Sequence, residues 1–209
     1  MPTLYIISGC NGSGKTTCTY SLLPEMLECK QYVNSDEFAK ALSPFNPGAA
    51  SLKAGRLMLL KVKYLMDRNE TFSIETTLAT RTLIKIATIA QNRGYSVVIL
   101  YFWLSSPQMA IQRVHNRVAA GGHDIPEEVI KRRYYMGLDY LFNDYIPMCD
   151  HWILADNSDP PFKVIAQGSK GEEPIVRDPK TYEIIKTITR SAKKLSDENS
   201  SLSEKEAQE

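Results

Sequence analysis

The sequence predicts an α/β protein with a five-stranded parallel sheet and helices on both faces, and three observations lead to this class. Gly9 to Thr16 reads GCNGSGKT and fits the phosphate-binding pattern G-x-x-x-x-G-K-[ST]. An apolar, strand-like run precedes the motif at residues 3–8, and a helix-competent segment follows it from Lys15. Strand-like and helical segments then alternate along the chain, which is typical of parallel strands joined by right-handed crossovers. Together these features predict a P-loop NTPase fold.

Residues 9–16 have the composition that a phosphate-binding loop needs. Its glycines allow positive φ angles, so successive backbone N–H groups can converge on an anion at a helix N-terminus. The Lys15 ammonium group would contact the β and γ phosphates of ATP, and the Thr16 hydroxyl would ligate Mg²⁺. A Gly-rich turn without function is the alternative, which the strand–loop–helix context disfavours. The expected nucleotide-binding residues are Gly9, Asn11, Gly12, Ser13, Gly14, Lys15, Thr16 and Thr17.

Composition and charge exclude several classes of protein. The chain has 209 residues, 43% of them hydrophobic, which suits one globular domain. A net charge of +1 gives no electrostatic argument for nucleic acid or an anionic membrane surface. No stretch approaches the ~20 apolar residues of a membrane span, and the N-terminus does not read as a signal peptide. Four cysteines have neither metal-site nor disulfide spacing. We therefore expect a cytoplasmic protein without nucleic-acid or membrane partners.

Two carboxylates are expected at the carboxyl ends of strands, where ligands bind in open α/β sheets. Asp36 follows a short strand at residues 31–34, and Glu75 with Thr76 follows a strand at residues 71–74. Asp36 could take a proton from an attacking hydroxyl. Alternatively, Ser35 or Asp36 only caps the next helix. Position alone leaves these two interpretations of Asp36 open.

A long helix is expected at residues 49–68. Leu57, Leu60 and Tyr64 lie three and four residues apart, which predicts a buried stripe. Arg56 lies near the start of this helix and could meet an anionic substrate. A solvated charged face would give the same pattern, so this assignment also has an alternative.

Residues 107–140 are expected to form a mobile lid. A helix capped by Ser106 carries Arg113 and Arg117, a Gly-Gly pair follows at residues 121–122, and a second helix begins at Glu127 and carries Arg132 and Arg133. Two arginine-bearing helices around a Gly-Gly hinge are typical of a lid that closes over phosphates. Any single arginine here is more often a surface residue.

The C-terminal part of the chain predicts the rest of the domain. The apolar run at residues 95–103 suits a central strand buried on both faces, and residues 151–155 suit the last core strand. A small β-hairpin insertion is expected at about residues 162–177. The kinase domain would occupy residues 1–190, and the polar residues 191–209 are expected to be disordered.

Several segments together resemble a known family. These are GCNGSGKT at the P-loop, NSDEF at residues 34–38, AGR at 54–56, FSIETTLAT at 72–80 and RVHNRVAAGGHDIP at 113–126. The chain resembles zeta-toxin-like P-loop kinases over about residues 3–158, and most closely the short chromosomal proteins of that group. The P-loop is generic, whereas the ordered set of the other segments is much more specific.

The resemblance implies a function. Zeta toxins phosphorylate the 3′-hydroxyl of UDP-N-acetylglucosamine with ATP and Mg²⁺, and an antitoxin is an implied protein partner. Asp36 takes the place of the family's general base, Glu75 matches the glutamate of its E-x-T element, and Arg117 lies where a first lid arginine sits. The sequence departs from the family at Gly-Gly-His-Asp, so the second lid arginine is assigned further along. The expected catalytic residues are Lys15, Asp36, Arg117 and Arg133, and the expected substrate-binding residues are Asp36, Arg56, Glu75 and Thr76.

Other classes remain as alternatives. A P-loop ATPase or a nucleotide-binding regulatory module would share the phosphate loop without small-molecule kinase activity. The chain has no Asn-Lys-x-Asp motif for reading guanine and no Leu-Ser-Gly-Gly-Gln signature of a transporter ATPase. An ATP-dependent kinase acting on a small-molecule hydroxyl is therefore the preferred prediction.

Overall fold

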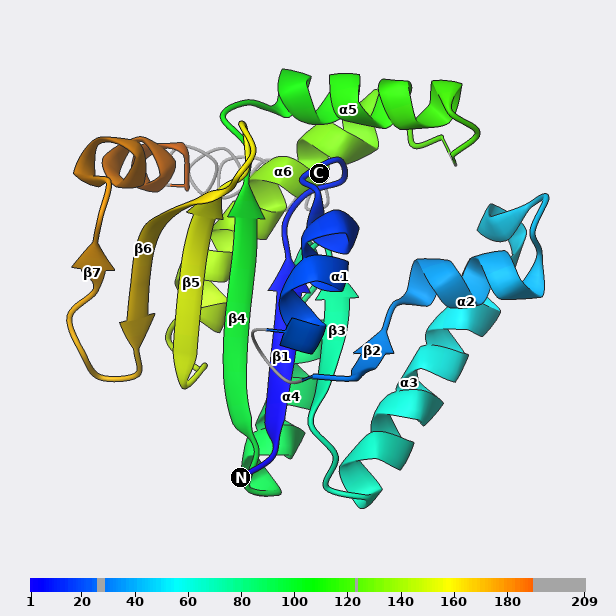
Figure 1. Ribbon diagram of the computed structural model, residues 1–209, viewed down its shortest axis with the longest axis horizontal. Helices are drawn as coiled ribbons and strands as arrows, with labels where there is room; N and C mark the ends of the chain where they lie inside the picture. The colour runs from blue at the N-terminus through cyan, green and yellow to red at the C-terminus, as the bar shows by residue number, and fades with distance from the viewer. Residues whose placement is uncertain (26–28, 123, 190–209) are drawn as a thin grey trace, which may run out of the picture.

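A seven-stranded sheet forms the centre of the computed structural model, which describes residues 1–25, 29–122 and 124–189. The strand order is β2-β3-β1-β4-β5-β6-β7 (Figure 1). The first five strands are parallel, whereas β6 and β7 are antiparallel to their neighbours. The strands are β1 (Thr3–Ser8), β2 (Gln31–Val33), β3 (Phe72–Thr76), β4 (Ser96–Trp103), β5 (His151–Asp156), β6 (Lys163–Ser169) and β7 (Ile175–Val176).

The five predicted parallel strands are therefore confirmed, but the hairpin extends the same sheet to seven strands. β6 pairs with β5 along its length, from His151 opposite Ser169 to Asp156 opposite Lys163. An antiparallel strand can pair with the exposed edge of β5 after a short connection, without a crossover helix. The predicted insertion is thus an extension of the sheet edge.

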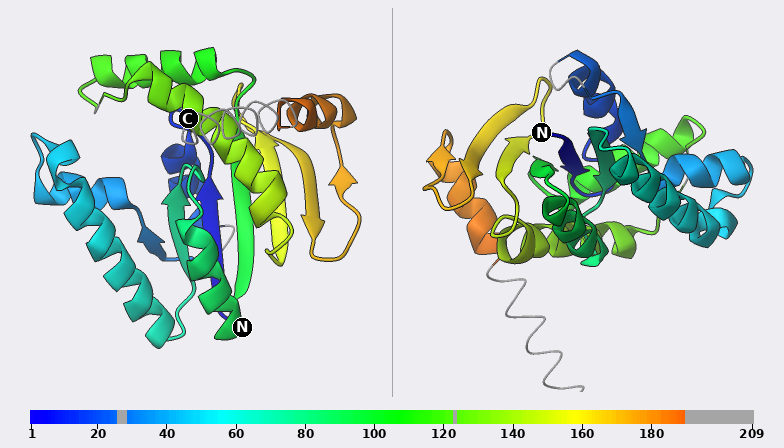
Figure 2. Two further views of the ribbon diagram at one scale, coloured as in Figure 1. Left: turned by 180° about the vertical axis from the view of Figure 1, so that it is seen from behind. Right: turned by 90° about the horizontal axis from the view of Figure 1, so that it is seen from below.

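Helices cover both faces of the sheet, as expected. Helix α1 packs on one face, whereas α4 and α6 cover the other (Figures 1 and 2). Helix α5 crosses the carboxyl ends of the strands, and α2 and α3 extend beyond the β2 edge. The helices are α1 (Lys15–Glu25), α2 (Ser35–Leu42), α3 (Ser51–Asp67), α4 (Thr82–Asn92), α5 (Pro107–Ala119) and α6 (Glu127–Tyr140), with a 3₁₀ turn at Pro47–Ala50 and a π turn at Leu141–Tyr145.

Strand alternation divides the core into two clusters. In β1, Leu4 and Ile6 belong to the larger cluster, whereas Ile7 belongs to the smaller cluster with Leu100 and Phe102. Successive side chains of a strand point to opposite faces, so β1 and β4 supply both clusters. The apolar segment at residues 95–103 therefore forms a central strand, as predicted.

The predicted buried stripe of α3 is wrong. Leu60 and Tyr64 are 63% and 53% exposed, and Leu57 is 38% exposed. The helix instead buries Ala54, Val62, Leu65 and Met66. Both sets have helical spacing, and periodicity alone does not tell which of two apolar stripes faces the sheet.

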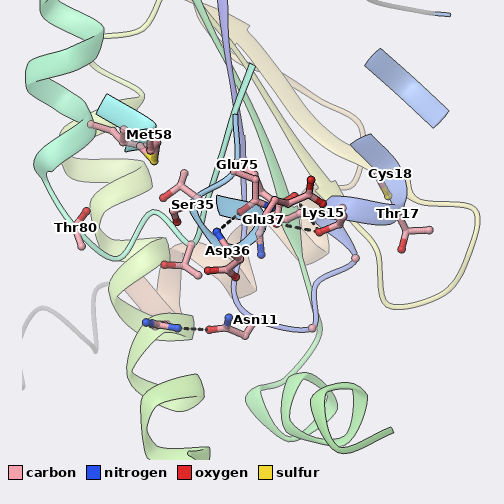
Figure 3. A pocket seen from close by; sticks show the side chains of 18 of the residues that line it. Asn11, Lys15, Thr17, Cys18, Ser35, Asp36, Glu37, Met58, Glu75 and Thr80 are labelled. Atoms are coloured by element: carbon pink, nitrogen blue, oxygen red, sulfur yellow. Dashed lines mark hydrogen bonds between the residues drawn. The ribbon is translucent and has the colours of Figure 1, made fainter. Parts of the chain in front are cut away.

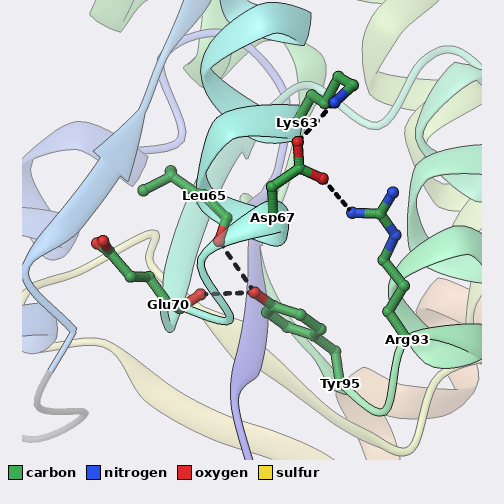
Figure 4. Close-up of polar contacts among 6 residues, drawn as sticks. All are labelled: Lys63, Leu65, Asp67, Glu70, Arg93 and Tyr95. Carbon is green, nitrogen blue, oxygen red and sulfur yellow. Dashed lines mark hydrogen bonds and ion pairs between the residues drawn. The ribbon is translucent and has the colours of Figure 1, made fainter.

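The C-terminal end of α3 is fixed by polar contacts to the segment between α4 and β4 (Figure 4). The Tyr95 hydroxyl donates to the carbonyl oxygens of Leu65 at 3.3 Å and Glu70 at 3.0 Å. Asp67 accepts from Lys63 at 2.5 Å and from Arg93 at 2.8 Å. These two cations hold the pKa of Asp67 below its usual range. The contacts anchor one end of α3, so its other end has a defined position at the ligand-binding edge.

Two further predictions can be compared with the structure. Ser106 is the N-cap of α5 and accepts from the Met109 N–H at 3.1 Å, with Pro107 in the first turn as expected. Residues 179–189 form a helix. His123 and the whole of the predicted disordered tail, residues 191–209, lie outside the described residues. Within the described ranges, no helix is both long and apolar enough to cross a membrane.

Candidate active site

The strand register places the predicted site residues at one edge of the sheet. Ser8 of β1 lies opposite Thr76 of β3 and Tyr101 of β4, so the P-loop begins level with the end of β3, whereas β4 continues to Trp103. A cleft of about 1140 Å³ lies at this edge. Figure 3 shows Lys15, Glu75 and Asp36 between two walls of the cleft, with Thr17 on one side and Met58 on the other. The cleft therefore has a phosphate-binding side and an opposite side built from α2 and α3.

Two glycines of the P-loop are required by their surroundings. Gly12 and Gly14 have φ angles of +79° and +82°, a region that other residues rarely adopt. A Cβ atom on Gly12 would lie 2.6 Å from the Ala110 carbonyl oxygen of α5, and one on Gly14 would lie 2.4 Å from Asn157 Nδ2. The loop is therefore packed between α5 and the segment that follows β5, and it has no room for side chains there.

Lys15 lies inside the loop. Its Nζ atom donates to the Cys10 carbonyl oxygen at 2.9 Å, and the side chain is buried. Burial lowers the pKa of Lys15, and the carboxylates of Glu75 and Asp36 oppose that shift. The ammonium group therefore lies within the electrostatic reach of both predicted carboxylates.

Thr16 and Glu75 form a pair at the base of the cleft. The Thr16 hydroxyl lies 3.1 Å and 3.0 Å from the two carboxylate oxygens of Glu75. Oxygen ligands of this kind suit Mg²⁺, which keeps several waters and takes further ligands from nucleotide phosphates. Across the described residues, no group of three or more His, Cys, Asp and Glu side chains is gathered as a metal site. The donor set fits an ion held jointly by Thr16, water and a nucleotide.

The N-cap of α2 is Asn34, and not Ser35 or Asp36 as the capping alternative required. Asn34 Oδ1 accepts from the Asp36 backbone N–H at 2.9 Å. The Asp36 side chain is therefore not the helix cap. It lies exposed on the cleft lining.

Three arginines of α5 and α6 line the cleft. Arg133 donates to Asn11 Oδ1 of the P-loop at 3.0 Å, and burial lowers its pKa, which nearby Asp36 partly opposes. Arg113 donates to the carbonyl oxygens of Asn157 at 2.9 Å and Ser158 at 2.6 Å. Arg117 also lines the cleft. Arg113 thus binds the backbone of the segment after β5, whereas Arg133 binds the phosphate loop.

The structure brings most of the predicted site residues into this one cleft. The members that line it are Asn11, Gly12, Gly14, Lys15, Thr16, Thr17, Asp36, Arg56, Glu75, Thr76, Arg117 and Arg133. Gly9 and Ser13 do not line it and are buried in the loop. Their contribution is to the shape of the loop.

Sequence reasoning placed Asn157 at this edge of the sheet but missed the contacts that Asn157, Tyr32 and Asn34 make around the cleft. Asn157 Nδ2 donates to the Ser13 carbonyl oxygen at 2.7 Å and so closes the P-loop from the β5 side. The Tyr32 hydroxyl of β2 donates to Glu75, and Asn34, the residue after β2, donates to that hydroxyl. The Asn-Ser-Asp-Glu sequence at residues 34–37 carries a cap signal that indicates Asn34, but no local signal connects Tyr32 to Glu75.

The strand order and the P-loop at the end of β1 define a P-loop NTPase, and the carboxylates and arginines around its cleft define the kinase type within that class. The family model described as "Zeta toxin" matches residues 1–141. The chain belongs to the zeta toxin family. The expected resemblance and the expectation of a P-loop kinase are thereby confirmed at the level of the family.

One relative in sequence and two structures illustrate the match. An uncharacterized protein of Haemophilus influenzae (strain ATCC 51907 / DSM 11121 / KW20 / Rd) is 30% identical over 126 residues, which are 60% of this chain and 88% of that protein. A crystal structure of AvrRxo1-ORF1:-ORF2 with ATP is 18% identical with a TM-score of 0.70, and covers 88% of this chain. The match spans only 63% of that longer chain. A structure from the PezAT chromosomal toxin–antitoxin system of Streptococcus pneumoniae is 14% identical with a TM-score of 0.64, covering 95% of this chain and 87% of that one. At these identities the two structures show a shared fold.

Proposed function

We propose that this protein is an ATP-dependent kinase that transfers the γ-phosphate to a hydroxyl group of a small molecule, with a nucleotide sugar such as UDP-N-acetylglucosamine as the acceptor. One observation carries the proposal. A single cleft joins a P-loop to an exposed carboxylate, Asp36, that does not serve as the cap of its own helix. Membership of the zeta toxin family supports the same reaction.

The phosphate side of the cleft would bind and orient ATP. The P-loop backbone and Lys15 would hold the β and γ phosphates, and Thr16 would ligate Mg²⁺. Bound Mg²⁺ would supply charge neutralisation between the two phosphates. Arg117 and Arg133 would stabilise charge that develops on the transferred group, with α5 and α6 as the lid that brings them in.

The opposite side of the cleft would bind the acceptor. Asp36 would accept the proton of the attacking hydroxyl, and Arg56, Glu75 and Thr76 would contact the rest of the molecule. Lys40 also lines this side, so two cations face the cleft there. Two cations beside carboxylates and hydroxyls suit an acceptor that carries both phosphate and sugar hydroxyl groups. These features support a nucleotide sugar over an apolar acceptor.

The first experiment measures transfer from labelled ATP in the presence of Mg²⁺ and UDP-N-acetylglucosamine, with a metabolite pool as a parallel acceptor. We expect Lys15→Ala to abolish transfer, because it removes the fixed positive charge beside the β and γ phosphates. Lys53→Ala is the matched control, since Lys53 is exposed on α3 outside the cleft lining. Wild-type turnover by Lys15→Ala would refute the kinase proposal. ATP binding without transfer to any acceptor would favour a regulatory module.

We further propose that an antitoxin-like protein binds this chain. Two of the structures of similar fold come from AvrRxo1-ORF1:-ORF2, which holds two proteins, and from the PezAT toxin–antitoxin system. Large apolar side chains are also exposed on and beside α2 and α3, which is typical of a surface that a partner covers. These are Leu42, Phe45, Leu52, Leu60 and Tyr64. Co-expression with the product of the neighbouring open reading frame tests this proposal. Joint purification with loss of kinase activity is expected, and unchanged activity would contradict it.

A further inference from the structure

A chain of hydrogen bonds connects the phosphate loop to the start of α2 through Tyr32, to which neither the family motifs nor the cleft lining assigns a role. The Thr16 hydroxyl donates to the carboxylate of Glu75. The Tyr32 hydroxyl donates to Glu75 Oε2, and Asn34 Nδ2 donates to the Tyr32 hydroxyl at 2.8 Å. Asn34 Oδ1 accepts from the Asp36 backbone N–H at 2.9 Å. One continuous path therefore joins the P-loop to the residue proposed as the general base.

The donors and acceptors along this path are mutually consistent. Burial and the hydrogen bond to Glu75 raise the pKa of Tyr32, so its hydroxyl keeps the proton that it donates. Asn34 is buried, and its amide nitrogen and oxygen are both used, one toward Tyr32 and the other toward Asp36. Its side-chain orientation is therefore fixed by two bonds of opposite polarity. Glu75 accepts from both sides, as a carboxylate does.

The direction of the Thr16 bond determines what Thr16 can offer to a ligand. A hydroxyl group has one proton and two lone pairs. Because Glu75 accepts the Thr16 proton, the lone pairs of Thr16 remain available to a cation in the cleft. If Glu75 turned away, the hydroxyl proton could point into the cleft and oppose a cation there. A fixed Glu75 carboxylate therefore keeps the Thr16 hydroxyl proton turned toward Glu75 and the Thr16 lone pairs turned toward the cleft.

On the basis of the proposed function, we propose that Tyr32 is a positioning residue for Mg²⁺–ATP. It holds Glu75 against Thr16, and through Asn34 it ties that pair to the backbone of Asp36. The hydrogen bonds of Tyr32 then position both the metal side of the cleft, through Glu75, and the acceptor side, through Asn34. Tyr32 itself does not line the cleft, so it acts through Glu75 and does not touch a ligand.

The ring of Tyr32 has a separate role in packing, which makes a clean substitution available. It packs against the smaller core cluster, and its centroid lies 6.0 Å from that of Tyr20 on α1. Tyr32→Phe keeps this ring and removes only the hydroxyl. Tyr20→Phe is the matched control, because the Tyr20 hydroxyl donates at 3.1 Å to Glu37, and the structure records no bond from it to Glu75.

The test measures ATP affinity by calorimetry, once with Mg²⁺ and once with EDTA, together with the Mg²⁺ dependence of phosphoryl transfer. Loss of a partner that orients a metal-binding group typically costs about 10–100-fold in metal affinity or activity. We expect Tyr32→Phe to weaken Mg²⁺–ATP binding about tenfold, to leave metal-free ATP binding unchanged and to raise the Mg²⁺ concentration for half-maximal transfer. Tyr20→Phe should match the wild type in all three measurements.

A double-mutant cycle with Glu75→Gln separates positioning from general destabilisation. If Tyr32 acts through Glu75, Tyr32→Phe should have little further effect on Mg²⁺–ATP affinity in the Glu75→Gln background. Additive losses, or equal losses with Mg²⁺ and with EDTA, would overturn the inference. The binding measurements need no acceptor, so they test Tyr32 even if the wild type transfers no phosphate and the proposed reaction fails. A wild-type protein that binds ATP equally with and without Mg²⁺ would also contradict the inference.

Discussion

Two arginines on different helices reach the same cleft, but their surroundings differ. Arg133 of α6 is partly buried and donates to Asn11 of the P-loop, beside Asp36. Arg117 of α5 lies near the end of its helix, where the Gly122 N–H donates to the Arg117 carbonyl oxygen at 2.9 Å. Arg133 is thus already attached to the phosphate loop, whereas the position of Arg117 depends on the turn that follows α5.

At the residue scale, we predict that Arg133→Ala lowers kcat more than Arg117→Ala does. An arginine that stabilises the transferred phosphoryl group can contribute ~10³ or more in rate. Arg132→Ala is the control, since Arg132 is the next residue of α6, is exposed and does not line the cleft. Steady-state kinetics at saturating ATP and acceptor provide the measurement. A loss in Arg132→Ala as large as that in Arg133→Ala would show that the assignment of the lid arginine is wrong.

The phosphate loop could be predicted from the sequence, and the contacts around it could not. Gly12, Gly14 and Lys15 fall in a contiguous pattern whose chemistry explains each residue. Tyr32 and Glu75 are 43 residues apart, and they meet because β2 pairs with β3. Neither residue type nor spacing marks such a contact, because it arises from strand pairing and not from a local motif. The contact between Asn157 and the P-loop was missed because it joins segments that follow β5 and β1, two strands brought to the same edge of the sheet by the strand order.

At the scale of elements, helical periodicity identified α3 but assigned the wrong face to the core. Its apolar residues form two stripes, and only the one with Val62 and Leu65 packs inward.

The space around a helix glycine also depends on tertiary packing, which the sequence does not show. Gly137 in α6 faces the Thr77 carbonyl oxygen and the Tyr101 hydroxyl, each 2.9 Å from where a Cβ atom would lie. Gly55 in α3 has nothing within 4 Å of that position.

These two helix glycines predict opposite responses to alanine. Gly137→Ala should lower the free energy of unfolding by about 1–3 kcal/mol, because the added methyl group meets backbone that cannot easily move. Gly55→Ala should raise it by up to about 1 kcal/mol, which is the difference in helix propensity between Gly and Ala. Urea denaturation measures both variants. An increase in stability for Gly137→Ala would mean that α6 does not pack as closely on the sheet as described.

At the scale of the whole molecule, the alternation of strands and helices predicted the parallel core and its helical layers. The two additional strands were recognised as a hairpin, but the pairing of β6 with β5 was not predicted. The exposed edge of a parallel sheet can pair with a further strand in either direction. The sequence of β6 does not specify which strand it pairs with. The domain boundary near residue 190 remains a prediction, because it rests on the polar composition of the last residues.

Truncation tests that boundary. Removing residues 191–209 should leave the melting temperature and the transfer rate unchanged, since this segment has too few apolar residues to bury a core of its own. Differential scanning calorimetry and the kinase assay provide the two measurements. A drop of several degrees in Tm would show that part of the segment belongs to the folded domain.

The central claim is that one cleft holds ATP on the P-loop and presents an acceptor hydroxyl to Asp36. Asp36→Asn keeps the size of the side chain and removes its basicity. Paired measurements of this variant test the claim most directly: ATP–Mg²⁺ affinity by calorimetry, and transfer to UDP-N-acetylglucosamine by mass spectrometry. We predict near-normal ATP affinity with transfer at least ~10²-fold slower than in the wild type. Normal transfer by Asp36→Asn would contradict the claim, whereas transfer by the wild type to a different hydroxyl compound would keep the mechanism and replace the acceptor.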